Sequence, residues 1–301
     1  MEIGQLNIER AQIKHTLKKE QRNLFIRKFL SNKLMVLGSL IIVFLLLLTI
    51  IGPLLTPYTP YEMETVNKLQ GPNAEHFLGT DEYGRDLFTR IVYGAKVSMG
   101  IGLSVSIISS IIGLIIGLCS SYFRYLDGVL MRIMDGLMAF PSILLAIALM
   151  AALGPKTGNV ILALTIVFTP YIARVVRSAA LIIKEETYIE AMKAQGASTF
   201  RIIWRHITPN ILSPMIVQAT FIFADAIINE ASLSFLGAGV PTPDPSWGTI
   251  LYDGKMVIFN TPWMVIFSGL MIVLSVLGLN LLGDGLRDLL DPHIKGGKKK
   301  K

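Results

Sequence analysis

The chain has little of what most catalytic and metal-binding sites require. Its 301 residues include one cysteine, Cys119, which lies in an apolar run, so a disulfide framework and a cysteine-based metal site are excluded. The four histidines are scattered, and no carboxylates have the spacing of a di-metal or protease site. The sequence also lacks a G-x-x-x-x-G-K-S/T phosphate loop. We therefore expect no enzyme activity, ATP binding, cofactor or metal in this chain.

Charged residues are also scarce. They make up 16% of the chain, against 52% hydrophobic residues, and the mean hydropathy is +0.57. A soluble domain of this length is less apolar, so the composition predicts an all-α polytopic membrane protein. The net charge of +7 does not indicate a nucleic-acid partner, because the Lys and Arg residues lie beside apolar runs in alternate loops.

Six apolar stretches predict transmembrane helices. The first is too long for a signal-peptide core and has no small-residue cleavage site, so we expect it to be retained. Pro141 and Pro170 fall inside predicted spans and predict kinks there. The six predicted spans are residues 34–55, 97–123, 136–153, 157–173, 211–238 and 262–283.

The distribution of basic residues predicts the orientation. Twenty-two Lys and Arg residues fall on one side of the predicted spans and five on the other. By the positive-inside rule, both termini are cytoplasmic and the loops 56–93 and 239–261 lie outside. This gives five segments: a cytoplasmic tail with an interfacial helix at 1–33, a first span at 34–55, an outer loop at 56–93, a five-helix core at 94–286 with a cytoplasmic loop at 188–210, and a basic tail at 287–301.

The cytoplasmic loop has the pattern of two short helices joined by a glycine. Residues 190–195 are good helix formers, and Gly196 is placed to end them in a left-handed conformation. Ser198 or Thr199 can cap a second helix, which Pro209 is predicted to end. Phe200, Ile203, Trp204 and Ile207 form an apolar stripe on that helix, with Arg201, Arg205 and His206 pointing elsewhere. Such an amphipathic hairpin suits docking into a groove.

The end of the first outer loop has a second charged pattern. Thr80 is predicted to cap a helix whose first turn holds Asp81 and Glu82, and Asp86 and Arg90 form an i,i+4 pair. Clustered Asp and Arg also occur in hydrolases, but no nucleophile-base pair accompanies them here. We expect structural salt bridges.

The cytoplasmic loop resembles the E-A-A-x3-G-x9-I-x-L-P loop by which permease subunits of ABC importers contact their ATPases. Glu190, Ala191, Gly196 and Pro209 match it. Met192 replaces its third residue, and His206 and Thr208 stand where Ile and Leu are expected, although R-H-I-T-P-N at 205–210 is similar to the peptide-permease variant.

Further motifs resemble the C-type permease subunit of dipeptide and oligopeptide ABC importers. The outer loop reads H-x-x-G-T-D-E-Y-G-R-D from residue 76, which includes Gly79, Thr80, Asp81, Gly84, Arg85 and Asp86. Later segments match D-x4-R-x2-D-x5-P from Asp127, E-x-x-L-S-F-L-G from Glu230, P-S-W-G from Pro245 and the closing G-D-G-L-R-D-L-L-D-P-H.

The resemblance implies a type I ABC importer permease fold in a prokaryotic cell membrane. It also implies a homologous permease partner, two cytoplasmic ATPases that bind ATP and Mg, an extracytoplasmic binding protein and a peptide substrate. Closure of the ATPases would act through the 190–209 loop on a pathway of which this chain forms half. Nickel, glutathione and opine-metal importers share these motifs, and an ion-coupled secondary transporter is the alternative from another class, although no repeated half is visible.

The fifth predicted span carries two carboxylates, Asp225 and Glu230. Intramembrane carboxylates are costly, so each should face water, a polar partner or a basic group. They are candidates for the pathway, and packing or capping roles near the outer end are equally open.

Overall fold

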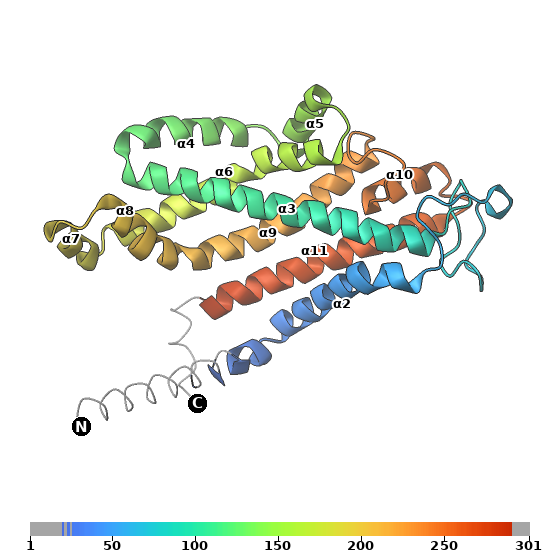
Figure 1. Ribbon diagram of the computed structural model, residues 1–301, viewed down its shortest axis with the longest axis horizontal. Coiled ribbons are helices and arrows are strands. Elements are labelled where there is room, and N and C mark those ends of the chain that lie inside the picture. The colour runs from blue at the N-terminus through green and yellow to red at the C-terminus, as the bar shows by residue number, and fades with distance from the viewer. Residues whose placement is uncertain (1–19, 21–22, 25, 291–301) are drawn as a thin grey trace.

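The computed structural model describes residue 20, residues 23–24 and residues 26–290. All regular elements of these residues are helices, arranged as an elongated bundle (Figure 1). In chain order they are α2 (Lys33–Leu55), η1 (Thr65–Asn67), α3 (Leu87–Tyr122), α4 (Arg124–Met138), α5 (Ser142–Leu153), α6 (Thr157–Lys184), α7 (Thr187–Ala194), α8 (Thr199–Arg201), η2 (Ile202–Ile207), α9 (Thr208–Phe235), α10 (Trp247–Met256) and α11 (Pro262–Leu290).

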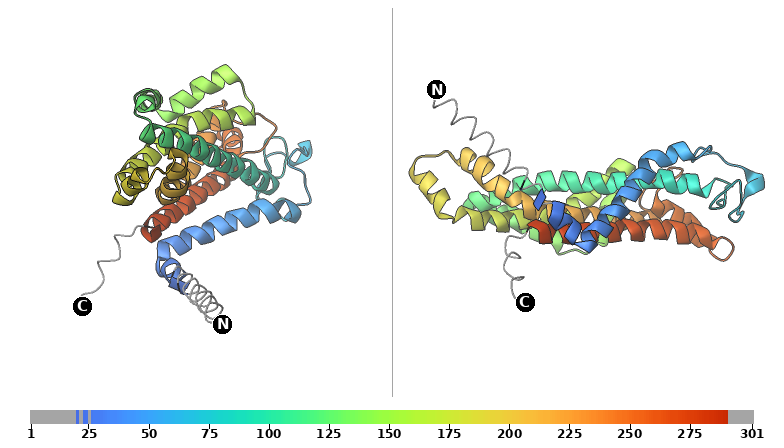
Figure 2. Two further views of the ribbon diagram at one scale, coloured as in Figure 1. Left: turned by 60° about the vertical axis from the view of Figure 1, so that its left-hand side comes forward. Right: turned by 90° about the horizontal axis from the view of Figure 1, so that it is seen from below.

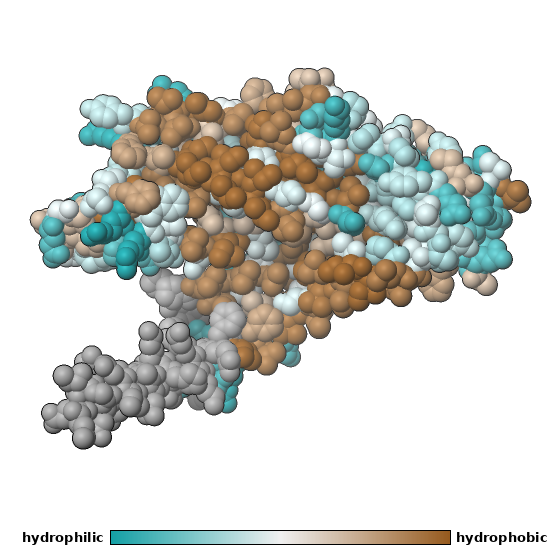
Figure 3. Space-filling model, viewed as in Figure 1, coloured by the Kyte–Doolittle hydropathy of each residue, from teal (hydrophilic) through white to brown (hydrophobic). Residues whose placement is uncertain are grey.

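Five helical segments are long and apolar enough to cross a membrane: α2, α3, α6, the continuous segment Thr199–Phe235 and α11. A broad apolar band covers the middle of the molecule, with hydrophilic residues gathered at its two ends (Figure 3). The first outer loop and α10 lie at one end, and α7 and α8 lie at the other (Figure 1). This separation is what a chain that spans a bilayer requires.

The predicted third span is not a straight helix. Residues 124–135, which we expected to be a loop, form most of α4, and α4 meets α5 at a bend of 94°. Pro141 stands in the break between them. Its ring removes a backbone donor and restricts the residue before it, so a helix does not continue through this position. The predicted straight span 136–153 is therefore wrong: α4 and α5 form a bent pair, which is long and apolar enough to cross a membrane only if the two helices together count as one span.

Small residues allow the helices to approach one another closely. A Cβ at Gly113 would lie 2.6 Å from the Ile172 side chain, and one at Gly117 would lie 2.6 Å from Val176. The four-residue spacing of small residues on α3 thus serves contact with α6 in the same chain. Gly278 of α11 faces Ile41 of α2 in the same manner, and α2 lies along the edge of the bundle beside α11 (Figure 2).

Element boundaries differ from the predicted ones at several ends. Helix α3 begins at Leu87, ten residues before the predicted span, because its first turns are buried in the outer polar structure. Helix α11 continues to Leu290. Residues 26–31 of the predicted interfacial helix are helical, whereas most of the 1–33 segment and the basic tail after residue 290 lie outside the described residues.

Candidate coupling site and polar networks

The turn at Gly196 ends α7 as the sequence predicts. Gly196 has a φ of 80°. Its N–H donates to the Lys193 carbonyl at 3.0 Å, and the Ala197 N–H donates to the Met192 carbonyl at 3.0 Å. These two bonds are those of the Schellman motif, which satisfies the last carbonyls of a helix through a left-handed residue. The turn therefore sets the direction in which the chain leaves α7.

The next helix does not end at Pro209. After α8, the turn η2 is a π-helix, and it leads without a break into α9. Pro209 is the second residue of α9, and the π turn directly precedes that helix. The Thr208 N–H reaches back to the Ile203 carbonyl, and the Asn210 side chain donates to the His206 carbonyl at 2.6 Å. The predicted terminator therefore lies inside a continuous helix.

The predicted apolar stripe divides into a buried half and an exposed half. Ile203 and Ile207 belong to the core, whereas Phe200 is 72% exposed and Trp204 is 46% exposed. The rings of Phe200 and Trp204 lie 6.1 Å apart between centroids. Ile203 and Ile207, four residues apart, both face the core, and Phe200 and Trp204, also four residues apart, both face outward. An exposed aromatic pair remains at the tip of the bundle.

The rest of this tip combines three exposed residues with one buried apolar residue. Glu190, Ala191 and Arg201 are exposed, and Ile189 is fully buried in the core. Glu190 lies in the first turn of α7, where the positive end of the helix dipole stabilises its negative charge. We call Glu190, Ala191, Phe200, Arg201 and Trp204 the coupling surface.

Four buried charged residues connect the 56–93 loop, the start of α3 and α10. Arg85 Nε lies 2.6 Å from Asp81 Oδ2, and Arg85 Nη2 lies 3.3 Å from Asp253 Oδ2 of α10. Arg90 approaches the same two carboxylates at 3.4 and 3.6 Å. Burial raises the pKa of the Asp253 carboxyl, and the two guanidinium groups oppose that rise. Two positive and two negative charges thus balance in a site that water does not reach, as a buried ion pair requires.

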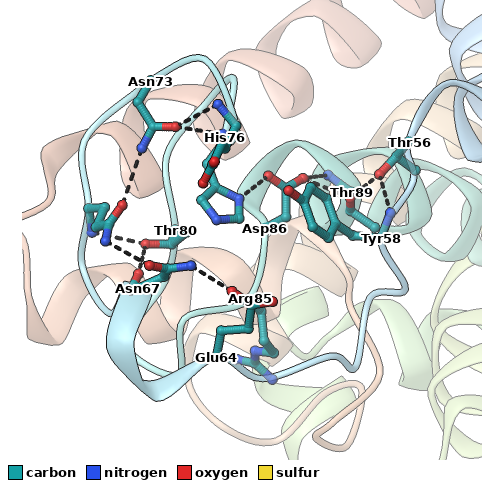
Figure 4. A network of polar contacts seen from close by, with 12 residues as sticks. Thr56, Tyr58, Glu64, Asn67, Asn73, His76, Thr80, Arg85, Asp86 and Thr89 are labelled. Carbon is teal, nitrogen blue, oxygen red and sulfur yellow. Dashed lines mark hydrogen bonds and ion pairs between the residues drawn. The ribbon is translucent and has the colours of Figure 1, made fainter.

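The predicted cap at Thr80 and the pair between Asp86 and Arg90 are not formed. Asp86 itself is the N-cap of α3, where its Oδ2 accepts the Thr89 N–H at 2.8 Å, while its Oδ1 lies 3.0 Å from His76 Nδ1 (Figure 4). Thr80 instead donates to the Asn67 carbonyl and accepts the Gln70 N–H. Residues 81–84 form a turn, in which Asp81 Oδ1 accepts the N–H groups of Tyr83 at 2.8 Å and Arg85 at 3.0 Å.

Gly84 at the end of this turn, and Gly79 before it, have left-handed backbone conformations. Gly79 has a φ of 85° and Gly84 a φ of 75°, a region that favours glycine. A Cβ at Gly84 would overlap the backbone carbonyl of Glu64. Glycine at position 84 therefore allows the backbone of residue 84 to pack against that of Glu64 within the 56–93 loop.

The two intramembrane carboxylates have different surroundings. Glu230 is fully buried, and it accepts hydrogen bonds from Ser98 at 2.9 Å and Ser234 at 2.8 Å. Ser98 in turn accepts the Trp247 N–H at 3.1 Å, so this carboxylate connects α3 and α9 to the start of α10. Asp225 is exposed on α9. Glu230 has a structural role in these contacts, and only Asp225 is open to a ligand.

The D-x4-R-x2-D segment meets α6 through ion pairs. Arg177 binds Asp127 with two bonds of 2.5 and 2.6 Å, and Arg174 Nη2 lies 2.6 Å from Asp135. These pairs hold α4 along α6 near the coupling surface. Sequence reasoning did not assign partners to these residues, and it missed Asp253, Ser98 and Trp247. Their only signal was their position in or near motifs, because each partner lies far away in the sequence.

Comparison with known proteins decides the family. Residues 109–296 match the family model described as the binding-protein-dependent transport system inner membrane component. The chain belongs to this family. Residues 21–72 also match the model of the N-terminal TM domain of oligopeptide transport permease C.

Curated relatives of this inner membrane component agree with the assignment. One is the dipeptide transport system permease protein DppC of Alkalihalophilus pseudofirmus, 49% identical over 88% of this chain and 87% of the relative. Another is a putative peptide transport system permease protein of Brucella abortus biovar 1, 46% identical over 89% of this chain and 91% of the relative. The fold is similar to a chain of the inward-facing MetNI methionine ABC transporter, with a TM-score of 0.56, 23% identity, and coverage of 67% of this chain and 96% of that chain. This inner membrane component thus has the type I ABC importer permease fold.

Proposed function

We propose that the chain is the C-type permease subunit of an ATP-driven peptide importer in a prokaryotic cell membrane. The observation that carries this proposal is the coupling surface, held by the Gly196 turn at the end of the bundle opposite the outer loop. The names of the dipeptide and peptide permease relatives support a peptide substrate. Both termini are cytoplasmic in this proposal, in agreement with the distribution of Lys and Arg.

The chain forms half of a pathway and pairs with a homologous permease. Two ATPases dock on the coupling surfaces, where the exposed Phe200 and Trp204 rings enter an apolar groove and Glu190 meets a basic group. ATP and Mg bind to the ATPases, because this sequence has no phosphate loop. An extracytoplasmic binding protein delivers the peptide to the outer end.

Closure of the ATPases moves the coupling surface, and the motion reaches the spans through rigid connections. The segment from α8 through η2 to α9 is one continuous helix of 37 residues, Thr199–Phe235. The ion pairs of Arg177 and Arg174 connect α6 to α4 near the same end. A displacement at the tip is thus transmitted to α9, α6 and α4 together.

The experiment is peptide uptake by the purified complex. The chain would be produced with its partner permease and the ATPases, and the complex would be reconstituted into liposomes. The binding protein and a labelled dipeptide would then be added. Uptake should need ATP and Mg on the cytoplasmic side and should survive ionophores that remove ion gradients. Uptake driven by an ion gradient without ATPases would indicate a secondary transporter. Mass spectrometry of the ligand on the binding protein would identify nickel, glutathione or an opine-metal complex in place of a peptide.

A further inference from the structure

A cavity of about 520 Å³ opens between α6, α9 and α11 near their cytoplasmic ends. Its walls are mainly apolar, with side chains such as Val175, Val217 and Phe221, and its polar members are Ser213, Gln218 and Arg287. Arg287 is the one charged residue among the described lining residues. The closing sequence motif that contains it has no other role assigned above.

The side of α9 that lines the cavity through Gln218 and Phe221 continues along the helix to Asp225. Gln218, Phe221 and Asp225 fall within about 60° of one another around the helix axis, at 100° per residue. Asp225 is exposed, and a carboxylate facing lipid at mid-membrane would cost about 3 kcal/mol. This face of α9 therefore meets water or a polar partner, and so does the cavity that shares it.

Two opposite charges, Asp225 on α9 and Arg287 on α11, lie at different levels along the bundle. Phe221 approaches Gly283 of α11, because a Cβ at that glycine would lie 3.1 Å from the ring. Asp225 is one helical turn outward from this contact, and Arg287 is one turn inward. With a rise of 1.5 Å per residue, the two levels are about 12 Å apart along the bundle. An extended peptide advances about 3.5 Å per residue, so three to four residues span this distance.

We propose that this cavity is the cytoplasmic part of the peptide path and that Arg287 receives the C-terminal carboxylate of the peptide. Asp225 attracts the N-terminal ammonium group, so a peptide moves with its carboxylate first. A dipeptide is too short for both contacts and passes from one level to the other. The inference rests on the proposed function and adds the chemical groups that the path selects.

The test uses uptake of three forms of one tetrapeptide: free, C-amidated and N-acetylated. Rates are measured in proteoliposomes at saturating binding protein, and each is divided by the rate of the free peptide. Because the binding protein is the same throughout, changes in these ratios between variants arise in the membrane subunits. Arg287→Gln should reduce the preference for the free acid over the amide about fivefold, the effect of a partly exposed ion pair. Asp225→Asn should reduce only the preference for the free amine.

Two controls separate position from charge. Arg287→Lys keeps the charge and should keep most of the preference for the free acid. Arg124→Gln removes an exposed charge of α4 outside the cavity and should leave both ratios unchanged. Unaltered ratios in an active Arg287→Gln transporter would overturn the inference. Absence of ATP-driven uptake in the wild-type complex would instead overturn the proposed function.

A second measurement covers the case in which Arg287→Gln fails to assemble. Gln218→Cys in a Cys119→Ser background should react with an impermeant maleimide applied to inside-out vesicles. Millimolar free peptide should slow this reaction, and the C-amidated peptide should slow it less. Labelling that appears only in detergent would show that lipid covers the cavity and would refute the assignment.

Discussion

Replacement of Gly196 isolates the contribution of one backbone conformation to coupling. Gly196 has a φ of 80°, and no heavy atom lies within 4 Å of the position that a Cβ would take. A side chain there meets no steric obstacle, so the cost comes from the left-handed conformation, about 1–2 kcal/mol for a residue with a Cβ. Such a cost reduces the ratio of the native turn to its alternative conformations about 5- to 30-fold, so the loss of native turn reaches this factor only where the two are close in free energy.

Gly196→Ala should therefore lower ATP-driven uptake by up to this factor, and the β-branched Gly196→Val should lower it further. The change lies outside the spans, so insertion and pairing with the other permease should be intact. Pull-down of the ATPases from solubilised membranes should weaken in the same order. Gly196→Asn should be closer to wild type, because Asn tolerates the left-handed region.

Gly128→Ala is the matched control. A Cβ at Gly128 also meets nothing within 4 Å, but its φ is not in the left-handed region. It should leave uptake and ATPase binding unchanged. Wild-type uptake by the Gly196→Val protein, with the ATPases still bound, would refute the coupling assignment.

Three further predictions test the topology and the buried polar groups. A single cysteine placed in the outer loop 56–93, in a Cys119→Ser background, should react with an impermeant maleimide in intact cells, and labelling only after lysis would reverse the topology. Glu230→Leu should lower the free energy of unfolding by about 1–3 kcal/mol for each serine hydroxyl left without its acceptor. Asp225→Leu should leave the free energy of unfolding unchanged and lower uptake. Normal assembly and transport by both variants would exclude both roles. Asp253→Ala should destabilise the outer end by about 3–5 kcal/mol, because it leaves two buried guanidinium groups with one carboxylate, and unchanged melting would contradict this account.

Local sequence was sufficient where the determining interactions are local. Apolar runs of sufficient length predicted five of the six spans, because the bilayer imposes a minimum length whatever the neighbours are, whereas the predicted third span is a bent helix pair. The Gly196 turn was predictable because a left-handed residue after a helical run depends on the backbone of a few adjacent residues.

Only the tertiary structure decided which distant residues meet. Sequence spacing paired Asp86 with Arg90, but folding brings α10 against the outer loop, so that Arg90 meets Asp253 and Asp81, and Asp86 is left to cap α3. The sequence predicted that Pro209 ends the helix, whereas η2 leads directly into α9 and the helix continues through this residue.

The two carboxylates of α9 show the same division. Their presence in an apolar span was visible in the sequence, but their surroundings were not. Ser98 is 132 residues away from Glu230 in the chain, and its contact, together with that of Ser234, buries that carboxylate, while Asp225 remains exposed. Hydrogen bonds across such separations depend on how helices cross, and periodicity within one helix does not determine that crossing.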